Sequence, residues 1–486
     1  MLPSTKRRAA QPLPLPATTA AASPSRYFSS PSNTSTNGTA DSPYTYKDKS
    51  LRPHSLRLRV QHALTRKRTL AVLFVTVFLA LAWALGLLGP ASVRTRTTRG
   101  SRVVARDWSA GAQAGVKGTK GGALVDAQGV AAPARFYNET VLILCPMRNA
   151  IEHIWHFFHL VDKLTYPRHL LHLAILVSDT TDGTYARALE LADERQYGRA
   201  YRGERYGRIS VFQKDFAADE ADSGEGETYT GENKGKERHA YEAQVGRRKL
   251  LAKSRTWLLS SALGPEVDWV LWADVDVVDY EPTLVERLMR YATKGGGVGA
   301  DVVVPNCVWK TYNEMGAYDR NNWIETPESL AMKASLPADQ VLIEGYKDHP
   351  TYRFNLASLA PSHPSQLSPH NPYLASPSLL LSSLPSFPPP ESLPASLQDA
   401  NTIPETLDLD GVGGCAALVR AEVHREGAVF PAWPSVDHQL ETEGFAQLVK
   451  ALRRGTSRSE IVSERKQGRG RLVGLPGYYV YHGLYG

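Results

Sequence analysis

The stretch Trp269–Val277, with the sequence WVLWADVDV, joins a buried strand to a pair of carboxylates. Its first five residues are apolar, as expected for a strand that is covered on both faces. Asp274 and Asp276 follow with one residue between them, so the strand carries both carboxylates to its carboxyl end. Hard divalent cations such as Mn²⁺ or Mg²⁺ bind oxygen ligands and fill their remaining positions with water or substrate phosphates. We therefore expect a metal ion here that bridges Asp274 and Asp276 to a diphosphate and neutralises it as a leaving group.

Two strand–helix units precede this stretch. Apolar runs at 141–145, 173–177 and 209–212 have the length of buried strands, and the segments between the runs space their apolar residues as helices do. The alternation predicts an α/β domain with a parallel sheet and helices on both faces. Ligands bind such sheets at the carboxyl ends of the strands. The residues at those ends are Pro146, Arg148 and Asn149 after the first strand, and Ser178, Asp179 and Asp182 after the second.

A predicted helix at 247–263 lies directly before the aspartate stretch and carries basic residues. It ends at a Gly-Pro pair, which stops helices. Arg248 and Arg255 are seven residues apart and so share one face, on which they either meet a diphosphate or lie in solvent. The residues before this helix, 215–244, are polar, glycine-rich and acidic, which predicts a mobile loop.

Two clusters near the C-terminus carry further candidate site residues. The first, Asp408–Gly414, has the sequence DLDGVGG, in which the glycines allow a close approach of the backbone to a ligand and Asp410 can face a sugar. A plain turn between strands is the alternative. The second, Tyr478–His482, is a short apolar run that ends in a possible metal ligand, His482, although a single histidine near a terminus is more often incidental.

The segment Leu70–Leu88, LAVLFVTVFLALAWALGLL, is predicted to cross a membrane. It contains no charge and no proline, and about 19 residues at ~1.5 Å each span close to the ~30 Å hydrocarbon layer. Arg66, Lys67 and Arg68 precede it, which places the N-terminus in the cytosol and the C-terminal body in the lumen. The predicted divisions are a disordered cytosolic tail at 1–68, a transmembrane signal anchor at 69–89, a luminal stem at 90–132 and a catalytic domain at 133–486, with an exposed Ser/Pro-rich insertion or sequence artefact at about 357–394.

Charge and cysteine content exclude several classes of protein. The formal charge of +7 is concentrated in residues 1–108, whereas the rest of the chain is acidic, so no nucleic-acid partner is expected. The three cysteines, Cys145, Cys307 and Cys415, are too widely spaced for a disulfide framework or a CxxC metal site. We interpret them as small buried hydrophobic residues, with the possibility that one pair is oxidised in a secretory compartment.

Taken together, the segments resemble the fungal Golgi mannan-polymerase subunits, the glycosyltransferase family 62 α-1,6-mannosyltransferases. The resemblance extends over most of residues 136–482 and keeps the order of the family's motifs. The matching stretches are VLILCPMRNA at 141–150, LAILVSDTTDGT at 173–184, WVLWADVDVV at 269–278, VVVPNCVWK at 302–310, LIEGYKDHPTYR at 342–353, DLDGVGGCAALVRAEVHREGAVFP at 408–431, HQLETEGFAQLVK at 438–450 and GLPGYYVYH at 474–482.

The resemblance implies a GT-A (Rossmann-like) fold, a GDP-mannose donor and Mn²⁺. It also implies retaining transfer to a mannosylated N-glycan, in a Golgi complex with a related subunit and with the catalytic domain in the lumen. The implied roles are metal ligation by Asp274, Asp276 and His482, a donor-facing acid at Asp410, nucleotide contacts at Pro146, Arg148 and Asp179, and acceptor contacts at Glu441 and Glu443. Arg255 is the diphosphate contact that we expect from the basic helix.

Two other functions fit parts of the sequence. Phosphatases of the haloacid-dehalogenase type also place an Asp-x-Asp after an apolar strand, and there Asp274 would be a nucleophile. Their motif opens the domain, however, whereas two strand–helix units precede it here. The second alternative is a catalytically weak, membrane-tethered subunit that organises a partner's mannosyltransferase.

Overall fold

The structure is a computed structural model, and all the residues that it describes lie within 76–486. The predicted tail at 1–68 and the predicted anchor at 69–89 lie outside the described residues. Among the described residues, no helix has both the length and the apolar composition that crossing a bilayer requires. The described ranges are 91–97, 102–109, 138–216, 241–292, 298–311, 314–337, 340–346, 348–384, 393–434, 438–452 and 470–483.

A mixed sheet of 14 strands organises the described part of the chain, in the order β1-β2-β5-β4-β3-β6-β15-β8-β16-β13-β12, with β7, β9 and β14 attached at its side. Its first half contains the predicted parallel strands, since β5, β4, β3 and β6 are neighbours that run in the same direction. The α/β class is therefore confirmed. The strands of this half are β1 (Ala91–Thr97), β2 (Arg102–Ser109), β5 (Arg208–Gln213), β4 (Leu171–Val177), β3 (Val141–Met147) and β6 (Trp269–Ala273).

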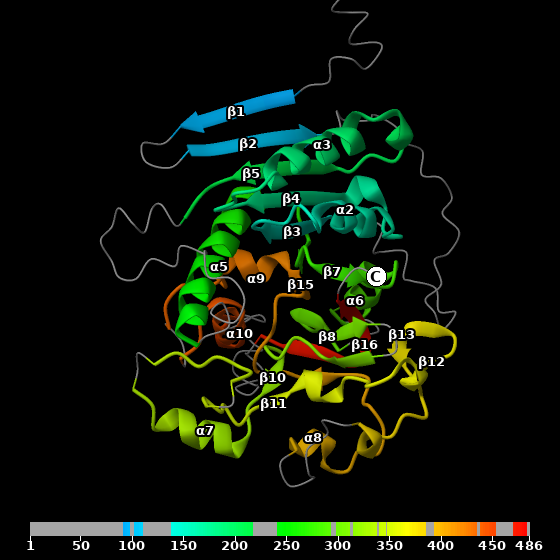
Figure 1. Ribbon diagram of the computed structural model, residues 1–486, viewed down its shortest axis with the longest axis vertical. Coiled ribbons are helices and arrows are strands. Elements are labelled where there is room, and N and C mark those ends of the chain that lie inside the picture. The colour runs from blue at the N-terminus through cyan, green and yellow to red at the C-terminus, as the bar shows by residue number, and fades with distance from the viewer. Residues whose placement is uncertain are drawn as a thin grey trace, which may run out of the picture. The chain divides into compact units, whose positions relative to one another are not determined.

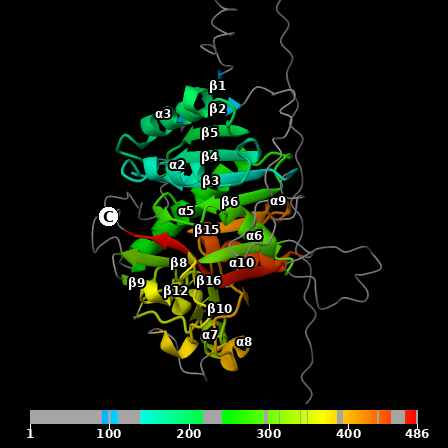
Figure 2. The same cartoon turned by 90° about the vertical axis from the view of Figure 1, so that its right-hand side faces the viewer.

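Helices cover both faces of this parallel region, as predicted (Figures 1 and 2). Ile143 packs in one core cluster with residues of α2 (Ile154–Asp162) and α3 (Thr184–Tyr197), whereas Leu142 packs in another with α5 (Tyr241–Ala262). Neighbouring residues of β3 thus point to opposite faces, and both faces are buried. The helix α5 begins six residues earlier than predicted and includes residues 241–244 of the predicted loop, while 217–240 lie outside the described residues.

The second half of the sheet begins beside β6, and its strand β16 ends near the turn that follows β6. β15 runs antiparallel to β6 and to β8, and β16 runs parallel to β8. These strands are β15 (Ala416–Arg420), β8 (Val302–Thr311), β16 (Leu472–His482), β7 (Val277–Asp279), β9 (Glu314–Ala317), β14 (Leu407–Asp408), β12 (Leu367–Ser368) and β13 (Asn371–Ala375). The separate pair of strands is β10 (Trp323–Ile324) with β11 (Phe354–Asn355), and the remaining α-helices are α6 (Leu284–Ala292), α7 (Pro327–Ala334), α8 (Ala395–Gln398), α9 (Ala421–Arg425) and α10 (Glu441–Ala451).

The predicted stem at 90–132 contains part of the sheet. Within it, β1 and β2 form an antiparallel pair, and β2 continues the sheet beyond β5. Trp108 at the end of β2 is buried, its indole nitrogen donates to Asp193 on α3 at 3.3 Å, and its carbonyl oxygen accepts from Gln196 at 3.1 Å. The folded domain therefore begins earlier than predicted. A strand near the edge of a sheet needs little apolar sequence, which is why arginine-rich residues concealed it.

The Ser/Pro-rich segment at about 357–394 is not an exposed insertion, so this prediction was wrong. Its described residues contribute β12 and β13 to the sheet, where β13 pairs with β16. Leu359 and Leu381 are fully buried, and the side-chain amide of Asn371 donates to Glu281 at 2.8 Å. Leucines between the prolines and serines enter the core through short turns, so they show neither the helical nor the strand period. Residues 385–392 lie outside the described ranges.

Candidate functional site

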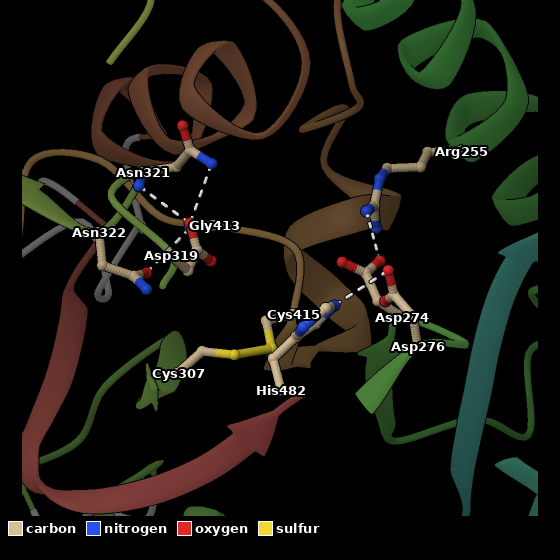
Figure 3. Close-up of a disulfide and its surroundings, with 10 residues drawn as sticks. All are labelled: Arg255, Asp274, Asp276, Cys307, Asp319, Asn321, Asn322, Gly413, Cys415 and His482. Carbon is tan, nitrogen blue, oxygen red and sulfur yellow. Dashed lines mark hydrogen bonds and ion pairs between the residues drawn. A yellow bond between two sulfur atoms is a disulfide. The ribbon is translucent and has the colours of Figure 1, made fainter. Parts of the chain in front are cut away.

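Asp274 and Asp276 lie in the turn after β6, at the carboxyl end of the parallel strands, as the sequence predicts (Figure 3). β6 is held between β3 and β15, so the start of the turn is fixed from both sides. The backbone nitrogen of Asp274 donates to the carbonyl oxygen of Cys415 at 3.1 Å, just before β15 begins. The two aspartates are thus anchored by strands in the middle of the sheet.

His482 reaches the same place from the far end of the sequence. It is the last residue of β16, where it pairs with Val277 of β7. Its Nε2 lies 3.1 Å from Oδ2 of Asp276, yet neither ring nitrogen makes a hydrogen bond of regular geometry, although both are buried. The Tyr318 ring stacks on the imidazole with a centroid distance of 3.7 Å. His482 therefore contacts Asp276, while its role as a metal ligand stays a prediction.

Asp274, Asp276 and His482 fit a divalent cation whose remaining ligands are phosphates of a substrate. No group of three or more His, Cys, Asp and Glu residues within the described ranges forms a complete metal site by itself. Asp276 and His482 supply two adjacent donors, and buried ring nitrogens without hydrogen bonds suit a metal ligand. A cation that binds substrate phosphates and water needs only one or two protein carboxylates, and the mixed oxygen and nitrogen donors suit a first-row ion such as Mn²⁺.

Arg255 orients the carboxylate of Asp274 through a hydrogen bond. Its Nη2 donates to Asp274 at 2.9 Å and its Nε to Glu441 at 3.0 Å, and the guanidinium is almost fully buried. A Cβ atom at Gly414 would lie 2.3 Å from the same Nη2, so the glycine makes room for this contact. Arg255 thus contacts two carboxylates here, and its direct contact with a diphosphate stays a prediction.

The two aspartates differ in their electrostatic surroundings. Burial raises the pKa of Asp274 to about 7, and the Arg255 guanidinium opposes this rise. For Asp276, burial also acts to raise the pKa, but the contact with His482 outweighs it, so the net pKa is lowered. The net effect favours the ionised form of Asp276, which His482 stabilises, over that of Asp274, for which burial outweighs the effect of Arg255.

A buried ion network continues from Arg255 along α5. Arg248 donates to Glu443 at 2.8 Å and to Asn321 at 2.7 Å, and Arg353 lies 2.9 Å from Glu344 and 3.9 Å from Glu443. Arg248 and Arg255 lie on a shared face of α5, as predicted, and this face is buried, not solvated. Glu443 is completely buried among these arginines, and its contact with an acceptor stays a prediction.

The ends of β3 and β4 lie together, as predicted for a nucleotide-facing edge. Pro146 pairs with Leu176, and the backbone nitrogen of Ser178 donates to Met147 at 3.1 Å. Asp179 has a positive φ of 48°, its nitrogen donates to Asp215 at 2.7 Å, and its carboxylate accepts from the nitrogen of Phe216 at 3.0 Å. Arg148 follows β3 and is partly exposed. Their contact with a nucleotide remains a prediction.

The contacts described for Asp410 are with residues other than the aspartate pair. Its carboxylate contacts the Lys450 ammonium group and accepts from the backbone nitrogen of Glu325 at 2.8 Å. Lys450 is at the C-terminal end of α10, whereas Glu441, which reaches Asp274 through Arg255, is at the N-terminal end. Nine residues of helix separate the two ends by roughly 13 Å. None of the contacts described for Asp410 reaches Asp274 or Asp276, and its position at the donor sugar stays a prediction.

Asp410 instead lines a cavity of about 740 Å³. The glycine-rich loop runs from this cavity to the metal site. Along the loop, Gly411 lies close to Trp323, Gly413 lies close to Asp319, and Gly414 lies close to Arg255. The polar residues around the cavity are Glu325, Thr326, Glu328, Gln398, Thr406, Asp408, Asp410 and Arg471.

The places of Asp319 and of the Cys307–Cys415 pair near the metal site were not predicted from the sequence, which indicated only that one pair of cysteines could be oxidised. Asp319 is buried and accepts from the backbone and side-chain nitrogens of Asn321, both at 2.9 Å, and burial raises its pKa. Cys307 and Cys415 form a disulfide, and Cys145 is a free buried thiol. Only the position of Cys415 beside the glycine-rich motif hinted at a role, because Asp319 lies in an irregular segment without periodicity.

The sequence matches the Anp1 family over residues 127–434. Relatives include the mannan polymerase II complex anp1 subunit of Schizosaccharomyces pombe, 33% identical over 71% of this chain and 64% of that protein, and the ANP1 subunit of Saccharomyces cerevisiae, 31% identical over 71% and 55%. The mannan polymerase complex subunit mnn9 of S. pombe is 31% identical over 71% of this chain and 80% of its own length. The chain belongs to the Anp1 family, which confirms the resemblance to mannan-polymerase subunits.

Among solved structures, a mannosyltransferase from Pyrobaculum calidifontis in complex with GDP-mannose and Mn²⁺ aligns with a TM-score of 0.33 and 12% identity, over 72% of this chain and 59% of that chain. This similarity is too low to support a conclusion about fold or ligand. The matches to the two Anp1 subunits cover less than two thirds of their length, so the activity and partners of a whole relative come to this chain only as proposals.

Proposed function

We propose that the protein is a GT-A glycosyltransferase that transfers mannose from GDP-mannose with the help of Mn²⁺. The observation that carries this proposal is the meeting of Asp276 and His482, at 3.1 Å, beside Asp274 at the carboxyl end of a parallel strand. The choice of mannose rests on membership of the Anp1 family, because relatives of this chain are named as mannan polymerase subunits. The phosphatase alternative has no support from the family.

Each part of the site has a role in this reaction. Asp276 and His482, with Asp274 beside them, would hold Mn²⁺, which when bound stabilises the charge of the departing diphosphate. Arg255 fixes the direction of Asp274, and Glu441 fixes Arg255. The ends of β3 and β4, with Pro146, Arg148 and Asp179, are the proposed surface for the nucleotide. Positioned charges of this kind need no rearrangement during the reaction, which is the basis of their catalytic effect.

We propose that the reaction retains the anomeric configuration, because an α-linked donor gives an α-1,6 product. The acceptor hydroxyl then attacks on the face from which GDP leaves. The acceptor would be the mannan backbone of an N-glycan, and the cavity beside Asp410 is a suitable place for its chain, because carboxylates and amides accept hydrogen bonds from sugar hydroxyls. Asp410 would therefore act on the acceptor side.

The proposed setting is a complex with a related subunit in the Golgi membrane, or in the endoplasmic reticulum. A single N-terminal anchor would leave the catalytic domain in the lumen. The disulfide between Cys307 and Cys415 agrees with this setting, since disulfides persist in oxidising compartments.

A second function, that of a catalytically weak organising subunit, is favoured by one observation. Within the described residues the aspartate and histidine side chains form no complete metal site, and Asp274 is turned to Arg255. In that case the chain would bind GDP-mannose without transferring the sugar.

A transfer assay separates the two functions. The purified full-length chain, alone and together with a related subunit, is given radiolabelled GDP-mannose, an α-mannoside acceptor and Mn²⁺. We expect labelled product whose formation stops when EDTA removes the metal and resumes when Mn²⁺ is restored. Transfer that continues in EDTA would contradict the proposed metal dependence. Binding of GDP-mannose without product under both conditions would favour the organising role.

Arg255→Lys is expected to lower kcat/KM for GDP-mannose by about 10- to 100-fold. Lysine keeps the charge but cannot donate from two fixed nitrogens to Asp274 and Glu441, and one hydrogen bond to a charged group contributes about 1.5–3 kcal/mol. Initial rates across GDP-mannose concentrations measure the effect.

The matched control is Arg287→Lys, because Arg287 is an equally buried arginine that holds Glu281 with two nitrogens, at 2.5 and 3.0 Å. Arg287 lies on α6 and Glu281 just before this helix, and neither belongs to the proposed site. The control should lower thermal stability with little change in kcat/KM of the folded enzyme. Equal losses of kcat/KM in both variants would show that Arg255 acts only through general stability.

A further inference from the structure

The disulfide between Cys307 and Cys415 lies at the boundary between two parts of the metal site (Figure 3). Asp274 and Asp276 follow β6, which pairs with β15, whereas His482 ends β16, which pairs with β8. His482 also pairs directly with Val277 of β7. The contact between β15 and β8 is therefore a second link between the two parts of the site.

β15 and β8 pair over a short length only. Their ladder consists of Leu418 with Val303 and Val419 with Val302, both away from the metal end of the two strands. Nearer the metal, Cys415 precedes β15 and Cys307 lies on β8, and the disulfide joins them with a Cα–Cα distance of 6.5 Å. The covalent bond thus holds the two strands together at the end where the backbone ladder does not.

Both half-cystines also hold site residues through their carbonyl oxygens. The oxygen of Cys415 accepts from the backbone nitrogen of Asp274 at 3.1 Å, and that of Cys307 accepts from the nitrogen of Asp319 at 3.2 Å. Cys307 pairs with Val480 in the register between β8 and β16, two residues before His482. The disulfide therefore connects the backbone of the aspartate turn to the strand that delivers the histidine.

We propose that this disulfide is a positioning element of the metal site: together with the pairing of His482 with Val277, it fixes the separation between Asp276 and His482 and so raises the affinity for the divalent cation. The inference rests on the proposed function of that site. Groups that orient metal ligands from outside typically change metal affinity by about 10- to 100-fold when they are removed. A role limited to fold stability would lower the free energy of unfolding but leave the affinity of the folded protein unchanged.

The test compares Mn²⁺ binding by three full-length proteins: the wild type, the double variant Cys307→Ala/Cys415→Ala, and the control Cys145→Ala. Cys145 is buried and free and has no part in the disulfide. Electron paramagnetic resonance of free Mn²⁺, in the presence of GDP, gives the dissociation constant without requiring transfer. Circular dichroism at the same temperature confirms that each protein is folded.

We expect the double variant to bind Mn²⁺ about 10- to 100-fold more weakly, and the control to bind like the wild type. A single variant, Cys415→Ala, should show the same loss, and the wild type should show it after reduction and recover on reoxidation. Equal affinity of the folded double variant and the wild type would overturn the inference, as would two free thiols at these positions in the native protein. If the wild type itself binds no Mn²⁺ with GDP, the proposed function fails instead.

Discussion

Asp276→Asn is expected to lower Mn²⁺-dependent mannose transfer by at least about 1,000-fold. Asp276 is the carboxylate that contacts His482 and whose pKa is lowered, so it is the ionised ligand of the proposed site. Neutralising it removes charge stabilisation of the leaving diphosphate, an effect of several kcal/mol, and each 1.36 kcal/mol changes the rate about tenfold. Initial rates at saturating GDP-mannose and acceptor measure the loss, with Mn²⁺ varied to detect weakened metal binding.

Asp279→Asn is the matched control for this prediction. Asp279 belongs to the same stretch, three residues further on β7, but its carboxylate accepts from the Tyr373 hydroxyl at 3.2 Å. The same chemical change there should leave transfer within a few-fold of the wild type. Similar losses in the two variants would mean that the stretch matters for its overall charge or stability, and not for a metal ligand at Asp276.

Arg353→Met is expected to destabilise the domain by about 3–5 kcal/mol. The guanidinium lies 2.9 Å from Glu344 and 3.4 Å from Glu325, and it stacks on the Trp323 ring at 3.7 Å, with 1% of the side chain exposed. Its removal leaves buried carboxylates without their counter-charge, which costs more than the pair itself contributes. The free energy of unfolding from urea titration measures the loss.

The loss caused by Arg353→Met should depend on pH in a stated direction. Burial raises the pKa of Glu443 to about 7, and the guanidinium of Arg353 is one of the groups that oppose the rise. Without Arg353 the pKa of Glu443 should rise further. The folded variant then accommodates the protonated form of Glu443, whereas the ionised form destabilises it. Stability of the variant should therefore fall as the pH rises from 6 to 8, relative to the wild type.

Arg187→Met serves as the stability control. Arg187 pairs with Glu190 three residues along α3 at 2.9 Å, but both side chains are well exposed. Such a surface pair contributes about 0–1 kcal/mol, so the variant should unfold close to the wild type. If Arg353→Met loses no more stability than Arg187→Met does, the buried network around Arg353 does not stabilise the domain as proposed.

The parallel half of the sheet and the aspartate pair were predictable from the sequence because their signals are local. β3, β4 and β6 are each a continuous apolar run, since both faces of a central strand are buried. The position of Asp274 and Asp276 then follows from the rule that ligands bind at the carboxyl ends of such strands. His482 needed the family resemblance, because nothing local distinguishes one histidine near a terminus.

The features that the sequence did not predict depend on contacts between distant segments. The hairpin of β1 and β2 is held to the domain by Trp108, which contacts α3. The segment at 357–394 is held by leucines that enter the core without a regular period. The partners of Arg255 and Arg248 come from α10, nearly two hundred residues later. The contact of Asp410 with Lys450 is of the same long-range kind.

Binding of Mn²⁺ in the presence of GDP-mannose tests the central claim most directly, because it does not depend on an acceptor or a partner subunit. Electron paramagnetic resonance of the full-length chain should show that GDP-mannose tightens Mn²⁺ binding, and that the effect disappears in His482→Ala as well as in Asp276→Asn. Mn²⁺ binding that is unchanged in either variant, or that GDP-mannose does not affect, would contradict a nucleotide-sugar metal site built from the ends of β6 and β16.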